Sequence, residues 1–143
     1  MAQGRITLDE VNEISAGLTW VQQLGLKVEE VGDGTARLRL PGTEDLLRPG
    51  GTISGPSMMT LADYAMYIAV LGAIGRVELA VTTNLSINFL RKPEVGDVLA
   101  DCRLLKCGKR LAYGEVLLTS EALGPEEVVA HCTATYSIPP DRE

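Results

Sequence analysis

One segment of the sequence, from Pro56 to Leu71, constrains the fold more than any other. It consists of good helix formers, begins with a proline at a plausible first helical position, and is apolar on nearly every face. A helix without a polar face must be covered on all sides. The segment also contains one carboxylate, Asp63, and is marginal in length for a bilayer span. We therefore predict a buried helix.

The rest of the chain has the patterns of strands and of one short helix. Strands are expected at residues 24–31, 35–40, 81–89, 98–107, 110–120 and 127–138. Gly32-Asp33-Gly34 is a strong hairpin signal between the first two strands. Near the N-terminus, Thr7 and Glu10 have the spacing of a capping box. They predict an amphipathic helix that ends near Gly17 or continues through Val21.

A single apolar helix among six strands is most economically covered by one curved antiparallel sheet. The expected class is α+β, in one domain spanning residues 1–143 with a helical segment at 1–23. One sheet cannot cover every side of the helix, and its edge strands stay open to pairing. We therefore expect a homodimer or a dimer of dimers.

Composition indicates which kinds of binding partner and which cellular compartment to expect. The chain has a net charge of −6 and lacks the basic cluster of a nucleic-acid-binding protein, so no nucleic-acid partner is expected. Residues 1–13 lack the apolar core of a signal peptide. Cys102, Cys107 and Cys132 show no CxxC spacing, and we interpret them as reduced structural thiols. These features predict a cytoplasmic protein with no membrane partner.

Asp63 is the carboxylate with the least expected surroundings. Its helical neighbours at three and four positions are Met59, Thr60, Met66 and Tyr67, so it needs polar partners or a functional pocket. A carboxylate in such a place can have a raised pKa and act as a general base, or it can act as a nucleophile. Both routes stay open, as does an aspartate solvated at the edge of a groove.

The start of the same helix, Ser54-Gly55-Pro56, offers hydrogen-bond donors. The first N–H groups of a helix are unpaired and lie at the positive end of its dipole, and glycine allows a carbonyl group to approach closely. Because proline has no N–H, the donor must be Gly55 or a residue after Pro56. The segment is a helix cap that can also serve as an oxyanion hole.

Other catalytic chemistries lack their residues in this sequence. The single histidine, His131, is expected on the sheet face opposite Cys132 and Tyr136. No second histidine and no suitable cluster of Cys, Asp or Glu supports a metal site. A Ser-His-Asp triad is also unsupported, because the sequence has no GxSxG elbow. We therefore expect no metal.

Together these elements resemble the PaaI-like branch of the hot-dog thioesterases. The resemblance covers about residues 46–139 and rests on Leu61-Ala62-Asp63 in the apolar helix, on the INFLRKP strand end with its following Gly-Asp, and on the Gly-Lys turn. It implies a hot-dog fold, a curved antiparallel sheet wrapped around one long central helix. It also implies hydrolysis of the thioester of a small or medium acyl- or aryl-CoA. Coenzyme A is then part of the substrate, and no cofactor is expected.

The resemblance also assigns roles to residues. Asp63 would be the nucleophile or general base, and the Gly55 N–H would stabilise the oxyanion. Ser54 would support the pocket, and Thr82 would bring a hydroxyl from the partner subunit. The residues expected to contact the substrate are Arg48, Thr83, Arg91, Lys92, Lys109 and Arg110.

Two departures from the family pattern keep alternatives open. Ser54-Gly55-Pro56 stands where the family has His-Gly-Gly, and Arg48 stands where it often has asparagine. If Arg48 pairs with Asp63, the pKa of that carboxylate falls and the base weakens. A non-catalytic acyl-CoA-binding protein is therefore the second hypothesis. A hot-dog hydratase or dehydratase is the third, and the position of His131 in the last strand argues against it.

Overall fold

The computed structural model describes residues 4–42, 47–48 and 52–140. Its helices are α1 (Leu8–Ala16), α2 (Thr19–Leu24) and α3 (Gly55–Ile74). Its strands are β1 (Lys27–Gly32), β2 (Thr35–Leu40), β3 (Leu47–Arg48), β4 (Thr52–Ile53), β5 (Val81–Phe89), β6 (Val98–Cys107), β7 (Leu111–Ser120) and β8 (Val128–Ser137).

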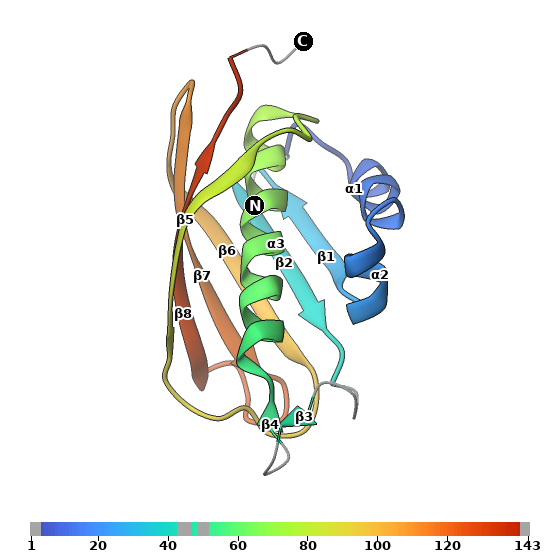
Figure 1. Ribbon diagram of the computed structural model, residues 1–143, viewed down its shortest axis with the longest axis vertical. Coiled ribbons are helices and arrows are strands. Elements are labelled where there is room, and N and C mark those ends of the chain that lie inside the picture. The colour runs from blue at the N-terminus through green and yellow to red at the C-terminus, as the bar shows by residue number, and fades with distance from the viewer. Residues whose placement is uncertain (1–3, 43–46, 49–51, 141–143) are drawn as a thin grey trace.

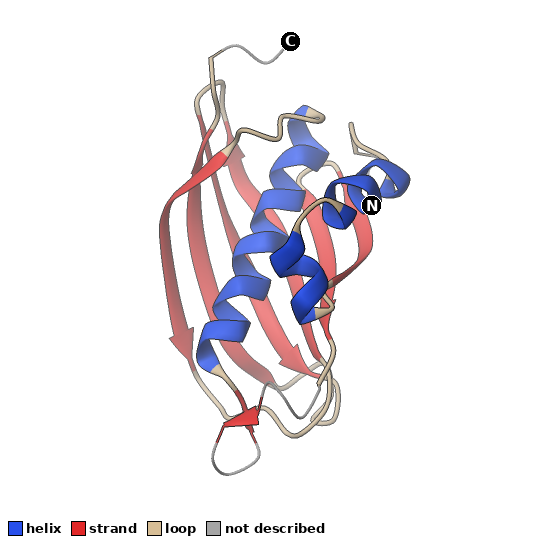
Figure 2. Ribbon diagram, turned by 45° about the vertical axis from the view of Figure 1, so that its right-hand side comes forward, coloured by secondary structure: helices blue, strands red, loops and turns tan. Residues whose placement is uncertain are grey.

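Six of the strands form one antiparallel sheet in the order β1-β2-β6-β7-β8-β5. The sheet curves around α3, while α1 and α2 lie beside α3 at the β1 end of the sheet (Figures 1 and 2). The predicted α+β architecture, a curved antiparallel sheet around one long apolar helix, is confirmed. The short β3–β4 hairpin was not predicted; it lies in the Gly- and Pro-rich connection that leads into α3.

The N-terminal segment contains two helices where one was predicted. The capping box is present, with Thr7 Oγ1 accepting a hydrogen bond from the Glu10 N–H at 3.1 Å. The first helix ends at its C-cap Gly17, and α2 follows. Gly25, with φ of 70°, ends α2 in the left-handed conformation that glycine adopts readily. As a result β1 begins at Lys27 and not at residue 24.

The helix α3 is the centre of the hydrophobic core. It is long and apolar enough to cross a membrane by length and composition, but 67% of that stretch is buried inside the fold. One stripe remains accessible: Pro56 and Met59 are exposed, and Asp63 and Tyr67 are partly exposed. These positions are three or four residues apart and so share one face of the helix. The predicted buried helix is therefore open to solvent along the face that carries Asp63.

The edge strand β5 has an irregularity that decides which of its side chains face α3. Within the sheet it pairs only with β8, and the register shifts between Thr82 and Asn84, so that Thr83 is an extra residue. Simple alternation placed Thr83 on the same face as Leu85 and Ile87. The bulge instead brings Thr82 to that face, toward α3, and leaves Thr83 exposed.

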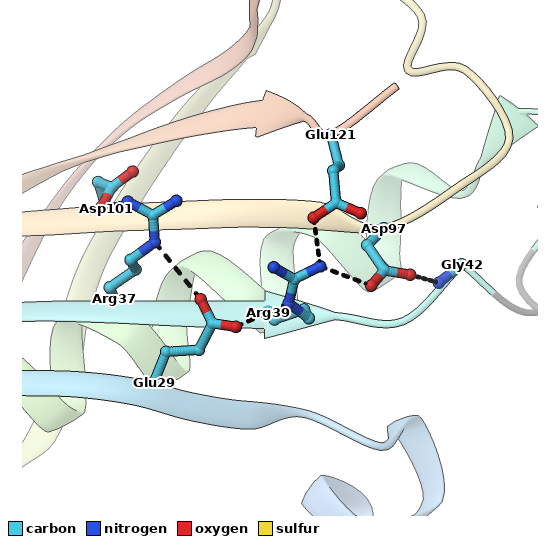
Figure 3. Close-up of polar contacts among 7 residues, drawn as sticks. All are labelled: Glu29, Arg37, Arg39, Gly42, Asp97, Asp101 and Glu121. Atoms are coloured by element: carbon cyan, nitrogen blue, oxygen red, sulfur yellow. Dashed lines mark hydrogen bonds and ion pairs between the residues drawn. The ribbon is translucent and has the colours of Figure 1, made fainter. Parts of the chain in front are cut away.

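A network of charges on the outer face of the sheet joins β1, β2 and two loops (Figure 3). Arg39 donates to Asp97 at 2.7 Å, to Glu121 at 2.6 Å and to Glu29 at 2.7 Å. Asp97 also accepts a hydrogen bond from the Gly42 N–H at 2.9 Å. The Gly42 hydrogen bond, followed by the one from Arg39, holds the pKa of Asp97 below its usual value.

We expect Asp97→Asn to lower the free energy of unfolding at pH 7 by about 1 kcal/mol, because the carboxylate accepts two hydrogen bonds but is partly exposed. The folded-state pKa of Asp97 is lowered. Its contribution is therefore present above an unfolded-state pKa of about 3.9 and is lost as the pH falls through the folded-state pKa. Urea denaturation from pH 7 to pH 3 would measure this.

The matched control is Asp101→Asn. Its side chain is 50% exposed and only approaches Arg37 at 3.5 Å, whereas the Asp97 side chain is 30% exposed. This variant should cost less than half as much as Asp97→Asn. Equal costs for the two variants, or a cost of Asp97→Asn that does not change with pH, would contradict the assigned role.

Candidate active site

Asp63 lies halfway along α3 and is held by hydroxyl groups from two strands. Its Oδ1 accepts hydrogen bonds from Thr82 Oγ1 of β5 at 2.7 Å and from the Tyr136 hydroxyl of β8 at 2.9 Å. The same Tyr136 hydroxyl lies 3.0 Å from the Asp63 carbonyl oxygen. Among the side chains that the structure describes, none forms a hydrogen bond with Oδ2. Two hydroxyls therefore orient one oxygen of the Asp63 carboxylate.

The origin of the Thr82 hydroxyl differs from the prediction. The family resemblance implied a hydroxyl from the partner subunit, but Thr82 reaches Asp63 of its own chain. The reason is the connection after α3, which turns the chain back so that β5 runs along the helix. Thr83 does not join this cluster: it is exposed on the bulge and donates to the Thr135 carbonyl at 3.2 Å.

Tyr136 is a site residue that the sequence analysis did not assign. Burial raises the pKa of Tyr136 far above its usual value, and the neighbouring Asp63 carboxylate raises it further. The phenol therefore stays protonated and acts as a hydrogen-bond donor. A signal was available in the sequence, because strand alternation turned Tyr136 inward and a buried tyrosine hydroxyl needs a partner.

A cavity of about 200 Å³ opens beside Asp63. Its walls are largely aromatic and include the only tryptophan and three of the four tyrosines of the chain. The lining residues are Leu18, Trp20, Asp63, Tyr64, Tyr67, Glu78 and Tyr136. Burial, with a smaller contribution from Glu78, raises the pKa of Tyr67 to about 12, so this phenol is also neutral.

The first turn of α3 carries the predicted oxyanion donor. Ser54 is the N-cap: its Oγ accepts from the Ser57 N–H at 3.3 Å and donates to the Ser57 hydroxyl at 2.8 Å. Gly55 is the first helical residue and precedes Pro56. A Cβ added to Gly55 would lie 3.3 Å from the ring of Phe89, so the end of β5 runs beside this turn.

Gly55 and Asp63 are too far apart to act together within one chain. Eight residues of α-helix separate them, which corresponds to about 12 Å along the axis. A carbonyl carbon in reach of the Asp63 carboxylate cannot have its oxygen at the Gly55 N–H of the same chain. The two predicted functions therefore lie at separate places along α3.

The predicted cations occupy both ends of the sheet. Arg91 and Lys92 are exposed after β5, and Arg91 pairs with Glu127 at 2.8 Å. Lys109 and Arg110 lie at the β6–β7 turn, beside a hollow of about 470 Å³ that Lys106 also lines. Arg48 belongs to β3, and its side chain lies outside what the structure describes, so its contact with the substrate, or alternatively with Asp63, stays a prediction.

Neither the histidine nor the buried cysteines can act as a catalytic partner of Asp63. His131 lies on the outer face of the sheet, as predicted, with Nε2 at 3.0 Å from Glu115 Oε1. Burial raises the pKa of Cys132 to about 11, with a smaller effect of Asp63, and burial raises the pKa of Cys102 above its usual range. Cys107 is exposed at the end of β6, contrary to the prediction of a packed thiol.

Comparisons with known proteins agree with the fold. The sequence matches the family model of the thioesterase superfamily over residues 50–125. A crystal structure of a candidate thioesterase from Silicibacter sp. is 46% identical, with a TM-score of 0.84 over 96% of this chain and 95% of that one. A candidate esterase from Saccharolobus solfataricus is 32% identical over 126 residues, which are 83% of each protein.

A further solved structure is a mutant of the phenylacetic acid degradation protein PaaI from Thermus thermophilus. It is 27% identical, with a TM-score of 0.73 over 84% of this chain and 98% of that one. The resemblance predicted from the sequence is thus confirmed. With its hot-dog fold, the chain belongs to the thioesterase superfamily.

Proposed function

We propose that this protein is an acyl-CoA thioesterase with Asp63 as its catalytic carboxylate. The observation that carries the proposal is the environment of Asp63 in a chain of this family. Two hydroxyls orient one carboxylate oxygen, while the other has no partner among the described side chains and the group borders an apolar cavity. The cavity suits an acyl group, and the oriented carboxylate suits attack at the carbonyl carbon beside it.

In the general-base route, Asp63 takes a proton from water while the water oxygen bonds to the thioester carbon. The carbonyl electron pair moves onto oxygen, where an N–H donor stabilises the charge. When this pair returns, the C–S bond breaks, and the CoA thiolate takes up the proton held by Asp63. In the nucleophilic route, Asp63 attacks the carbon itself, the thiolate leaves, and water hydrolyses the resulting anhydride. Both routes place the same demand on the position of Asp63.

The oxyanion donor in this proposal is the Gly55 N–H of a second copy of the chain. The strand β5 runs along α3. Near its start, Thr82 donates a hydrogen bond to Asp63, and at its end Phe89 lies beside Gly55. A second copy that pairs antiparallel with the open edge of β5, about a midpoint near Leu85, would bring the Asp63 end of one chain to the Gly55 end of the other. Such a two-fold dimer contains two composite sites.

The Lys109–Arg110 turn is proposed to bind the phosphates of CoA. Across the sheet, Tyr136 pairs with Ala112 of β7 on one side and with Thr82 of β5 on the other. Arg110 is two residues before Ala112, so the turn lies just beyond the strand positions that contact Asp63. Replacing both cations by alanine should raise KM about fivefold and leave kcat unchanged, because exposed charges contribute little each. Lys27→Ala, an exposed cation on β1, should change neither constant. An unchanged KM in the double variant would remove the turn from the site.

We expect Asp63→Asn to lower kcat at least about 100-fold with CoA thioesters, since a positioned proton acceptor contributes that much or more. The fold should be intact, because asparagine has nearly the same shape. Asp101→Asn, on the outer face of the sheet, is the matched control and should retain wild-type kcat. The assay is CoA release from a panel of short, medium, long and aryl acyl-CoAs, with a protein-only blank for the cysteines.

Two results of this assay would change the assignment. Full activity of Asp63→Asn would remove the carboxylate from the mechanism. A wild type that binds acyl-CoA saturably and hydrolyses no member of the panel would establish the non-catalytic binding protein instead.

Gly55→Pro removes the proposed oxyanion donor without removing the residue. Proline is well tolerated in the first turn of a helix, and Ser54, at φ −68° and ψ 143°, already has the extended conformation required before proline. We expect kcat to fall about 100-fold. Gly55→Ala is the control: it adds the same Cβ beside Phe89 but keeps the N–H, and it should lose far less activity. Equal losses would show that space at this position matters and the donor does not.

Mixing the two inactive variants tests the composite site. In a dimer of one Asp63→Asn chain and one Gly55→Pro chain, one of the two sites has both functional groups intact. With random pairing on co-expression, half of the dimers are mixed, so about a quarter of the wild-type activity should return. Activity that stays at the level of the separate variants would show that each chain holds a complete site.

A further inference from the structure

The N-terminal helices reach the cavity at Asp63. Leu18 caps the start of α2, Trp20 lies in its first turn, and both side chains line the cavity with Asp63 and Tyr64. This segment precedes residues 50–125, over which the chain matches the thioesterase superfamily. One wall of the cavity therefore comes from a part of the chain outside the family match.

Several contacts hold this wall in place against α3. Ser15 Oγ and the buried Tyr64 hydroxyl are 2.6 Å apart. The Trp20 ring packs edge-on against the Tyr64 ring, with centroids 5.2 Å apart and planes at 84°. Near the far end of α3, Arg76 pairs with Glu13 of α1 at 3.2 Å. The segment that carries Leu18 and Trp20 is thus held against α3 by ring packing and by polar contacts.

The cavity, which is open to solvent on one side, is small for a ligand pocket. Its volume is about 200 Å³. Pockets that hold drug-sized molecules usually have about 300–1,000 Å³. Tyr64 and Tyr67 line the cavity from α3, with ring centroids 5.9 Å apart and an angle of 21° between the ring planes. A space of this size suits a compact acyl group better than a long alkyl chain.

We propose that Leu18 and Trp20 are specificity-determining residues that limit the acyl group to a compact one. The inference rests on the proposed thioesterase function, because it identifies the cavity as the acyl site. Trp20 is 43% exposed and caps the space from the solvent side, so its removal opens the wall without opening the core. The N-terminal helical segment then selects the substrate, while α3, β5 and β8 supply the carboxylate and its supports.

The first test compares acyl length preference in variants of the wall. Trp20→Ala should raise the ratio of kcat/KM for octanoyl-CoA over butyryl-CoA at least about tenfold, since a few methylene groups in an apolar pocket have effects of this size. Leu18→Ala should shift the ratio in the same direction, and Trp20→Phe should keep it near the wild-type value. The matched control is Leu8→Ala, also in the N-terminal segment and 39% exposed, but outside the cavity.

The outcomes are distinct. Folded Trp20→Ala and Leu18→Ala proteins with an unchanged ratio would overturn the inference, as would an equal shift in Leu8→Ala. Circular dichroism and thermal unfolding identify a variant that has lost its fold, and in that case Leu18→Ala and Trp20→Phe carry the comparison.

The second test does not need turnover. Because Trp20 is the only tryptophan, its fluorescence reports directly on this cavity. A non-hydrolysable butyryl-CoA thioether should change the emission saturably, whereas free CoA should leave it unchanged. The octanoyl thioether should bind the wild type at least about tenfold more weakly. Binding measured by calorimetry without a change in emission would overturn the inference. A wild type that hydrolyses no acyl-CoA but binds the short thioether more tightly would overturn the proposed function. The same result would support the role of Leu18 and Trp20 in selecting the acyl group.

Discussion

The structure depends on one physical conflict, a carboxylate in the middle of a helix that is apolar on nearly every face. The helix α3 is the element around which the core packs, yet Asp63 cannot be buried there without polar partners. The chain resolves the conflict by bringing two hydroxyls to one oxygen, Thr82 from β5 and Tyr136 from β8. The two strands are neighbours in the sheet, so the same pairing that completes the core also orients the carboxylate.

The position of β5 then decides what remains accessible. As the edge strand it leaves backbone donors and acceptors open, and beside it runs the accessible stripe of α3. Helix geometry separates Gly55 from Asp63 by two turns of that stripe. The place of β5 at the edge of the sheet leaves its backbone groups open to pairing, and the length of α3 keeps Gly55 away from Asp63. A second copy that pairs with β5, as proposed, would cover this edge and bring its own Gly55 to Asp63.

The cavity at Asp63 combines two kinds of structure. Its base is formed by α3 and β8, elements of the common fold, whose tyrosines are kept neutral by burial. Its outer wall comes from Leu18 and Trp20 at the start of α2, and Ser15 of α1 and Trp20 both contact Tyr64. In our proposals the first part performs the reaction and the second selects the acyl group. This division would allow selectivity to change without disturbing the carboxylate.

Local patterns in the sequence were sufficient for the long elements of the fold and for two candidate site positions. A continuous apolar run predicted α3, strict alternation predicted β5, and a lone carboxylate in the apolar run marked Asp63. Ser54-Gly55-Pro56 marked the helix start, because capping depends only on neighbouring residues. Only the tertiary structure decided which hydroxyls reach Asp63. The bulge at Thr83 reverses the face on which Thr82 lies, and Tyr136 is 73 residues away in the chain. Periodicity describes one element at a time, whereas such contacts depend on how the register of a sheet and the packing of distant helices fit together.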